Sequence, residues 1–166
     1  MMNKKIIGFF LALFALLFAK ALFPSIQLMA FAPFFVILFI ETSFIISMWT
    51  VFGAGLTVDL FSNAHFGQTA LCYLLVCAFL YRQKRYFNDR PLSFALFAAF
   101  ISLVATLLSY PLQAIFQEPP ILSFSGCFSD LIIMPFIDGI YAIVWFFFPI
   151  SLIETMIKLG KKVLSR

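Results

Sequence analysis

The chain has 166 residues, of which 64% are apolar and 11% are charged, and its mean hydropathy is +1.09. Soluble domains carry about 25% charged residues. This composition therefore excludes a cytosolic enzyme, a nucleic-acid-binding module and a secreted domain held by disulfides. A membrane crossing takes roughly 20 residues, so six crossings would use about 120. We expect one all-α transmembrane domain over residues 1–166, with no separate soluble domain.

Six apolar runs predict six transmembrane helices. The weakest division lies at Glu41-Thr42-Ser43, where no Gly or Pro marks a turn and Met29 to Val58 could form one bent helix. Merging these two helices would move the basic cluster from Arg82 to Arg90 to the outer side, against the positive-inside rule. We therefore keep them separate. The six runs extend over Ile6 to Phe23, Ile26 to Ile40, Phe44 to Phe61, Phe66 to Tyr81, Leu92 to Tyr110 and Leu131 to Ile153.

The basic residues also predict the orientation. With the N-terminus in the cytoplasm, six crossings place ten of the eleven Lys and Arg residues on the cytoplasmic side. We therefore expect a multi-pass membrane protein with both termini in the cytoplasm. Ala19-Lys20-Ala21 resembles a signal-peptide cleavage site. Because Leu22 and Phe23 carry the apolar run beyond it, we expect the first helix to be retained.

No pattern of catalytic, cofactor-binding or metal-binding residues is visible in the sequence. His65 is the single histidine and lies in a predicted outer turn. Cys72, Cys77 and Cys127 lack the spacing of a metal site or a disulfide framework, and we expect them to pack as small apolar residues. The sequence therefore predicts a protein that is not an enzyme and has no cofactor.

Four ionisable residues fall in the outer half of the predicted bundle, where charged groups are costly to insert. They are Lys20, Asp59, Asp130 and Asp138. In one interpretation Lys20 extends to the outer interface and Asp59 caps a turn with Ser62 and Asn63. In the other, Lys20 pairs with Asp59 or Asp138 and ties the first helix to the bundle.

Two groups of small residues predict close helix contacts. Gly53 and Gly55 give the third helix room for close approach, and contacts within the chain are the expected role for both. Ala12, Ala15 and Ala19 form a row of small residues on the first helix. For this row, an inward contact and an interface with a partner are both open.

The stretch from Gly53 to Leu71 combines Gly-x-Gly-x-x-x-Asp-Leu, a short polar turn and an aromatic-Gly pair before a new apolar helix. With the chain length, the six predicted helices, the basic loop after the fourth and Pro135 in the last, it resembles the bacterial rod shape-determining protein MreD family. We expect Asp59 to accept backbone N–H groups at the turn and Gly67 to allow tight entry into the fourth helix.

The resemblance implies a helix arrangement similar to the substrate-binding subunits of energy-coupling-factor transporters and a non-enzymatic role in the bacterial inner membrane. Members of this family bind the single-span protein MreC. They help connect the MreB filament to the glycosyltransferase and transpeptidase that make side-wall peptidoglycan. The alternative is a substrate-binding subunit of such a transporter, which would bind a vitamin or a metal and copurify with a coupling ATPase.

Overall fold

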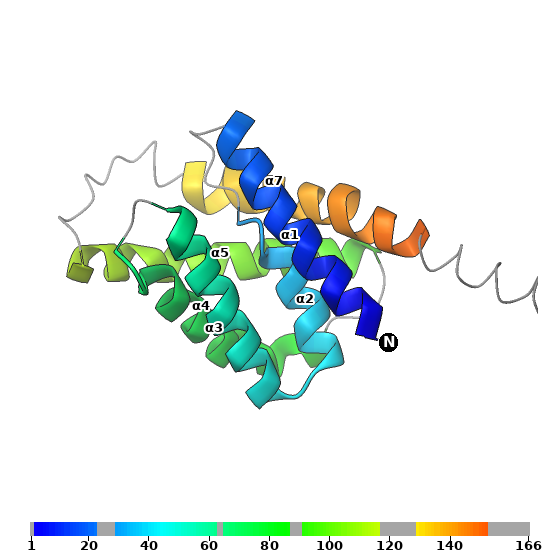
Figure 1. Ribbon diagram of the computed structural model, residues 1–166, viewed down its shortest axis with the longest axis horizontal. Coiled ribbons are helices and arrows are strands. Elements are labelled where there is room, and N and C mark those ends of the chain that lie inside the picture. Colours follow the sequence, from blue (N-terminus) through cyan, green and yellow to red (C-terminus); the bar gives the residue numbers. More distant parts are fainter. Residues whose placement is uncertain (1, 23–28, 63–64, 87–90, 117–128, 153–166) are drawn as a thin grey trace, which may run out of the picture.

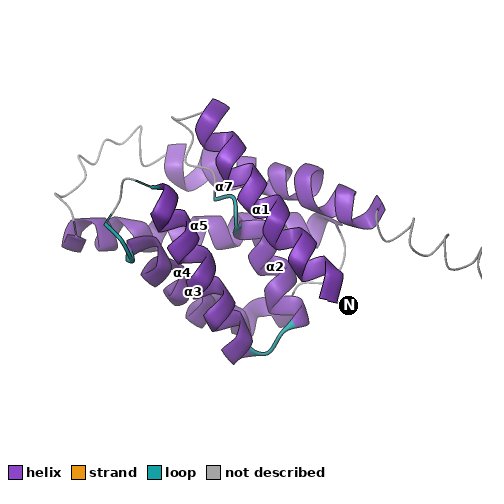
Figure 2. Ribbon diagram, viewed as in Figure 1, coloured by secondary structure: helices purple, strands orange, loops and turns teal. Residues whose placement is uncertain are grey.

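The computed structural model describes residues 2–22, 29–62, 65–86, 91–116 and 129–152. This part of the chain is helical and contains no strand (Figure 2). The six expected helices are all present. They are α1 (Met2–Leu22), α2 (Ala32–Glu41), α3 (Phe44–Phe61), α4 (Gln68–Leu80) with the 3-10 segment η1 (Tyr81–Tyr86), α5 (Pro91–Phe116), and a last helix over Ser129–Leu152.

The last helix is not uniform along its length. Its central part is the α-helical segment α7 (Met134–Tyr141), which lies between the π-helical segments η2 (Ser129–Ile133) and η3 (Ala142–Phe147). Pro135 lies inside this continuous helix, directly after η2, and has no N–H to donate to the preceding turn. The wide π turns therefore flank the segment that carries Asp138.

The predicted division between the second and third helices is confirmed. α2 ends at Glu41, and both Thr42 and Ser43 have extended backbone, which any residue can adopt without Gly or Pro. The Thr42 hydroxyl donates to the Leu38 carbonyl oxygen at 2.6 Å and lies 2.6 Å from the Ser47 hydroxyl. The Thr42 N–H also donates to the Leu38 carbonyl oxygen at 3.0 Å, so side-chain and backbone bonds together hold this turn.

Among the residues whose side chains the structure describes, three helices are long and apolar enough to cross a membrane, namely α3, α5 and the last helix. The second helix, expected as one of six crossings, is short in its described part. α2 has 10 residues, about 15 Å at 1.5 Å per residue, whereas the hydrocarbon core is about 30 Å thick. Apolar composition does not separate a lipid-spanning helix from a short buried one.

The predicted end of the fifth helix is also wrong. α5 continues past Tyr110 to Phe116, with Pro111 inside it. The interior proline is tolerated because neighbouring helices in a membrane bundle can compensate for the backbone hydrogen bond that it removes. Leu112, directly after the proline, is buried, so packing continues on this side of the helix.

α2 lies at the centre of the molecule, with α1, α3, α5 and the last helix arranged around it (Figure 1). Residues 32–39 are all buried, as expected for a helix that is apolar on every face. Its aromatic side chains pack against those of its neighbours. Phe35, for example, meets Tyr73 of α4 edge-on at 4.9 Å between ring centroids.

Candidate functional site

The Asp59 carboxylate at the end of α3 caps the start of α4. Its Oδ2 accepts hydrogen bonds from the backbone N–H groups of Gly67 (2.9 Å) and Ala70 (3.2 Å), and its Oδ1 accepts one from Thr69 (3.0 Å). The first N–H groups of a helix have no partner within it and favour a negative charge. The expectation that Asp59 binds backbone N–H groups at the turn is confirmed. It does so across the turn, at the start of α4, while Asn63 lies outside the described residues.

Gly67 gives the chain its sharp entry into α4. Its φ is +93°, in the left-handed region that side chains with a Cβ disfavour. This geometry allows its N–H and those of the first turn of α4 to point at the Asp59 carboxylate. The predicted role of Gly67 in a tight entry is therefore confirmed.

The two glycines of the motif differ in their surroundings. A Cβ on Gly55 would lie 2.3 Å from the Cα and 2.8 Å from the N of Ala70, so α3 and α4 touch backbone to backbone at this point. A Cβ on Gly53 would meet nothing within 4 Å. The expectation of close approach is confirmed for Gly55 and wrong for Gly53, which lies on another face of α3.

Asp138 lies on α7 and holds three segments together. It is 1% exposed. It accepts hydrogen bonds from the Ser102 hydroxyl of α5 and, at 3.3 Å, from the Met29 N–H in the turn before α2. Tyr141, one turn further along, donates to the Ala30 carbonyl oxygen at 3.2 Å. A buried carboxylate needs such partners, and here they fix the entry into α2.

Of the two remaining ionisable residues, Asp130 and Lys20, the structure describes the side chain of Asp130 only. Asp130 accepts a hydrogen bond from the Tyr110 hydroxyl at 3.0 Å, so it also faces α5. The side chain of Lys20 lies outside the described residues, so the pairing of Lys20 with Asp59 or Asp138 stays a prediction. Cys127 also lies outside the described residues. Cys72 and Cys77 are buried and free.

The row of small residues on α1 faces the protein's own interior. Ala12 and Ala15 are 0% and 5% exposed and belong to the core around α2, while the side chain of Ala19 lies outside the described residues. The outward face of α1 is instead aromatic and aliphatic. It carries a shallow apolar groove of about 480 Å³ lined by Ile6, Ile7, Phe10, Leu11, Leu13, Phe14 and Leu17.

Lys84 in η1 is a structural residue that the sequence did not reveal. Its ammonium group donates to the Phe39 carbonyl oxygen (2.8 Å) and the Tyr81 hydroxyl (2.8 Å), and lies 3.4 Å from the Thr42 carbonyl oxygen. It also lies 4.0 Å from the centre of the Tyr81 ring. A cation at a helix C-terminus can donate hydrogen bonds to the last carbonyl groups, and it interacts favourably with the negative end of the helix dipole. Lys84 therefore closes the C-terminus of α2 and its turn into α3.

We predict that Lys84→Met lowers the free energy of unfolding by about 2 kcal/mol, because hydrogen bonds to a charged donor are worth about 1.5–3 kcal/mol. The measurement is the thermal unfolding midpoint of the detergent-purified protein, followed by the fluorescence of its two tryptophans. Gln83→Met, one residue earlier in η1, is the matched control and should change the stability by less than about 0.5 kcal/mol. Equal losses in the two variants would contradict the role of Lys84.

The arrangement is suited to holding helices in place. The described aspartates of the bundle, Asp59, Asp130 and Asp138, each accept hydrogen bonds from the chain itself. Within residues 2–22, 29–62, 65–86, 91–116 and 129–152, no three His, Cys, Asp or Glu side chains come together as a metal site would need. His65 is exposed in the turn between α3 and α4.

The chain matches no protein-family model, and neither the curated proteins nor the solved structures contain one that is significantly similar to it.

Proposed function

We propose that this protein is a non-enzymatic scaffold of the bacterial inner membrane that binds a single-span, MreC-like protein. Through that partner it would link the MreB filament to the enzymes of side-wall peptidoglycan synthesis. The observation that carries the proposal is the motif around Asp59, because this motif is the part of the sequence that resembles the MreD family. Its carboxylate, the close backbone contact at Gly55 and the left-handed backbone at Gly67 serve the packing of α3 on α4.

The contacts of Lys84 support the proposed topology. Lys84 follows α4 and binds carbonyl groups at the end of α2, so both helices end on the same side of the molecule. Six crossings with a cytoplasmic N-terminus require this arrangement. Arg82, Arg85 and Lys84 then lie on the cytoplasmic side, as the positive-inside rule favours.

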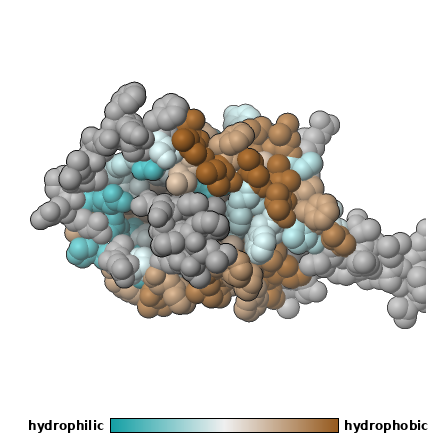
Figure 3. Space-filling model, turned by 90° about the horizontal axis from the view of Figure 1, so that it is seen from above, coloured by the Kyte–Doolittle hydropathy of each residue, from teal (hydrophilic) through white to brown (hydrophobic). Residues whose placement is uncertain are grey.

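The surface that we propose for the partner is the outward face of α1. This helix lies across one side of the molecule and packs mainly on α2 and η3 (Figure 1). Its small residues are already used inside the chain, and its outward side offers the apolar groove. Viewed from above, hydrophobic residues gather in bands over the described part of the surface (Figure 3). A single apolar helix fits such a surface by van der Waals packing.

The transporter alternative is less well supported. Its ligand would be oriented by polar groups in the outer half of the bundle. The described carboxylates there, Asp59, Asp130 and Asp138, each already accept hydrogen bonds from the chain. A scaffold needs these residues only to hold its own helices, so we favour the scaffold.

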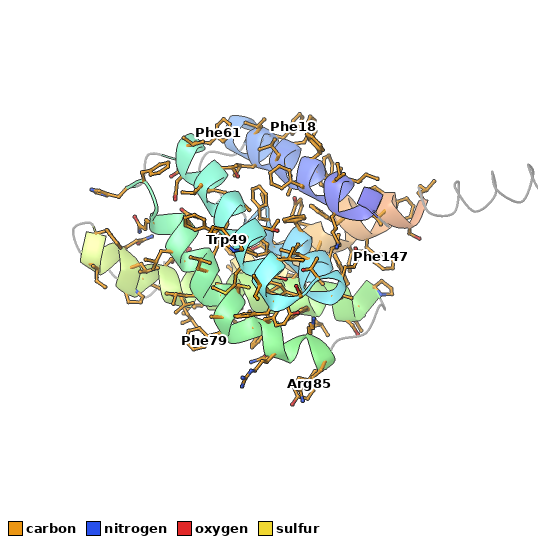
Figure 4. All side chains as sticks on the ribbon, turned by 60° about the horizontal axis from the view of Figure 1, so that its bottom comes forward. Phe18, Trp49, Phe61, Phe79, Arg85 and Phe147 are labelled. Atoms are coloured by element: carbon orange, nitrogen blue, oxygen red, sulfur yellow. The ribbon has the colours of Figure 1, made fainter. Side chains whose placement is uncertain are left out.

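Site-specific photo-crosslinking in cells tests the proposal. A photoreactive phenylalanine analogue replaces Phe10 on α1 or, as a matched control, Phe79 on α4, because each of these side chains is 62% exposed. Phe79 and another α1 residue, Phe18, lie on opposite sides of the molecule (Figure 4). We expect a crosslink to the MreC-like protein from position 10 and none from position 79.

Two results would oppose the proposal. A crosslink of equal yield from both positions would mean that α1 is not the binding face. Crosslinking or copurification of a transporter ATPase, together with nanomolar binding of a vitamin, would favour the transporter subunit.

A further inference from the structure

The segment η1 sorts its side chains onto separate faces. In a 3-10 helix, side chains three residues apart eclipse one another. Tyr81 and Lys84 are such a pair and bind the end of α2 and its turn into α3. Arg82 and Arg85 are the next pair and share another face. The spacing of the segment therefore separates an anchored face from one that carries two guanidinium groups.

Both arginines are free to meet a ligand. Arg82 and Arg85 are exposed, and neither forms a hydrogen bond or ion pair with the residues whose side chains the structure describes. Arg85 points away from the helices at the edge of the molecule (Figure 4). The first turn of η1 contains no acidic residue, so the positive charge of this face is not offset within that turn.

The anchored face holds these two groups in position. The Tyr81 hydroxyl donates to the Thr42 carbonyl oxygen at 2.7 Å, and Lys84 binds the same turn. Tyr86, the last residue of η1, is 79% exposed. A tyrosine at such a position suits the headgroup level of a bilayer, where its ring is apolar and its hydroxyl is hydrated. The arginine pair is thus fixed at the end of the bundle, beside a residue typical of the membrane interface.

We propose that Arg82 and Arg85 together bind the phosphate of an anionic phospholipid in the cytoplasmic leaflet. Guanidinium groups match the geometry of phosphate oxygens, and a net negative headgroup complements the two positive charges of this face. The inference rests on the membrane placement given under Proposed function, but not on the partner protein. Each arginine should strengthen binding about fivefold at an anionic membrane surface.

Native mass spectrometry of the full-length protein in detergent tests this proposal, with phosphatidylglycerol as the probe. We expect Arg82→Gln/Arg85→Gln to weaken binding of the first phosphatidylglycerol about 25-fold. The matched control, Arg82→Gln/Gln83→Arg, keeps the net charge but moves one arginine off the shared face. It should weaken binding about fivefold. Phosphatidylcholine, which has the same phosphate but no net charge, should bind more weakly than phosphatidylglycerol to the unmodified protein.

Three results would overturn the proposal. Unchanged binding in the double Gln variant would remove the arginines from the site. Unchanged binding in the charge-preserving variant would mean that net charge, and not the shared face, attracts the lipid. Displacement of phosphatidylglycerol by millimolar inorganic phosphate would indicate a site for a free anion.

Two further measurements keep the result interpretable. Thermal unfolding midpoints equal to that of the unmodified protein show that both variants are folded. Crosslinking from position 10 is measured in the same variants. If lipid binding is unchanged while crosslinking to the partner is lost, η1 contacts a protein instead and the lipid proposal fails. If only lipid binding is lost, the scaffold proposal stands.

Discussion

Gly55→Ala is expected to destabilise the protein by about 3 kcal/mol or more. The new Cβ would lie 2.3 Å from the Cα of Ala70, well inside van der Waals contact. Because the obstacle is backbone rather than a flexible side chain, α3 and α4 must separate. This would also move the N–H groups of Gly67, Thr69 and Ala70 away from Asp59. The measurement is the thermal unfolding midpoint in detergent, together with the yield of monodisperse protein in size-exclusion chromatography.

Gly53→Ala is the matched control for this prediction. It makes the same chemical change two residues earlier in α3, but its Cβ would meet nothing within 4 Å. Alanine is favoured over glycine in a helix by up to about 1 kcal/mol, so this variant should be unchanged or slightly more stable. If both variants lose stability equally, the backbone contact at Gly55 does not hold the helix pair together.

Asp59→Ala is expected to cost about 3 kcal/mol or more. The substitution leaves the N–H groups of Gly67, Thr69 and Ala70 without their described acceptor, and each buried unpaired group costs about 1–3 kcal/mol. It also removes a negative charge from the N-terminus of α4. Asp59→Asn should lose less, because its amide oxygen can keep the bonds from Gly67 and Ala70 and lose only that from Thr69. The same thermal unfolding measurement ranks the three proteins.

Asp130→Ala serves as the control for the loss of a carboxylate. Asp130 is half-buried and has one described hydrogen bond, from the Tyr110 hydroxyl. Its removal should cost about 1 kcal/mol, the net worth of a single ordinary hydrogen bond. A loss as large as that in Asp59→Ala would mean that carboxylate charge in general, and not the cap on α4, stabilises the bundle.

The sequence predicted those features that depend on neighbouring residues. Asp59 and Gly67 are eight residues apart, and the need for an acceptor and a left-handed residue at a tight turn is visible from residue type alone. The six helices follow equally from the length of each apolar run. The break at Thr42-Ser43 was harder to predict, and it required the distribution of basic residues along the whole chain.

Features that depend on distant partners were not predictable in the same way. Gly53 and Gly55 lie about 200° apart around a helix at 100° per residue, so one of them faces α4, but neither residue type nor spacing says which. Lys84 binds a carbonyl oxygen 45 residues away and looks in the sequence like any other basic loop residue. The burial of α2 is hidden for a related reason, because lipid and a protein core select the same apolar side chains.

The position of α2 has a consequence for the order of assembly during biosynthesis. The turn before it is held by Asp138, 109 residues later in the chain, and its C-terminus is closed by Lys84, 45 residues after Phe39. When α2 leaves the ribosome, neither residue has yet been synthesised. Its placement can therefore be completed only after the last helix has been inserted, so the segment at the centre of the protein is among the last to reach its final position.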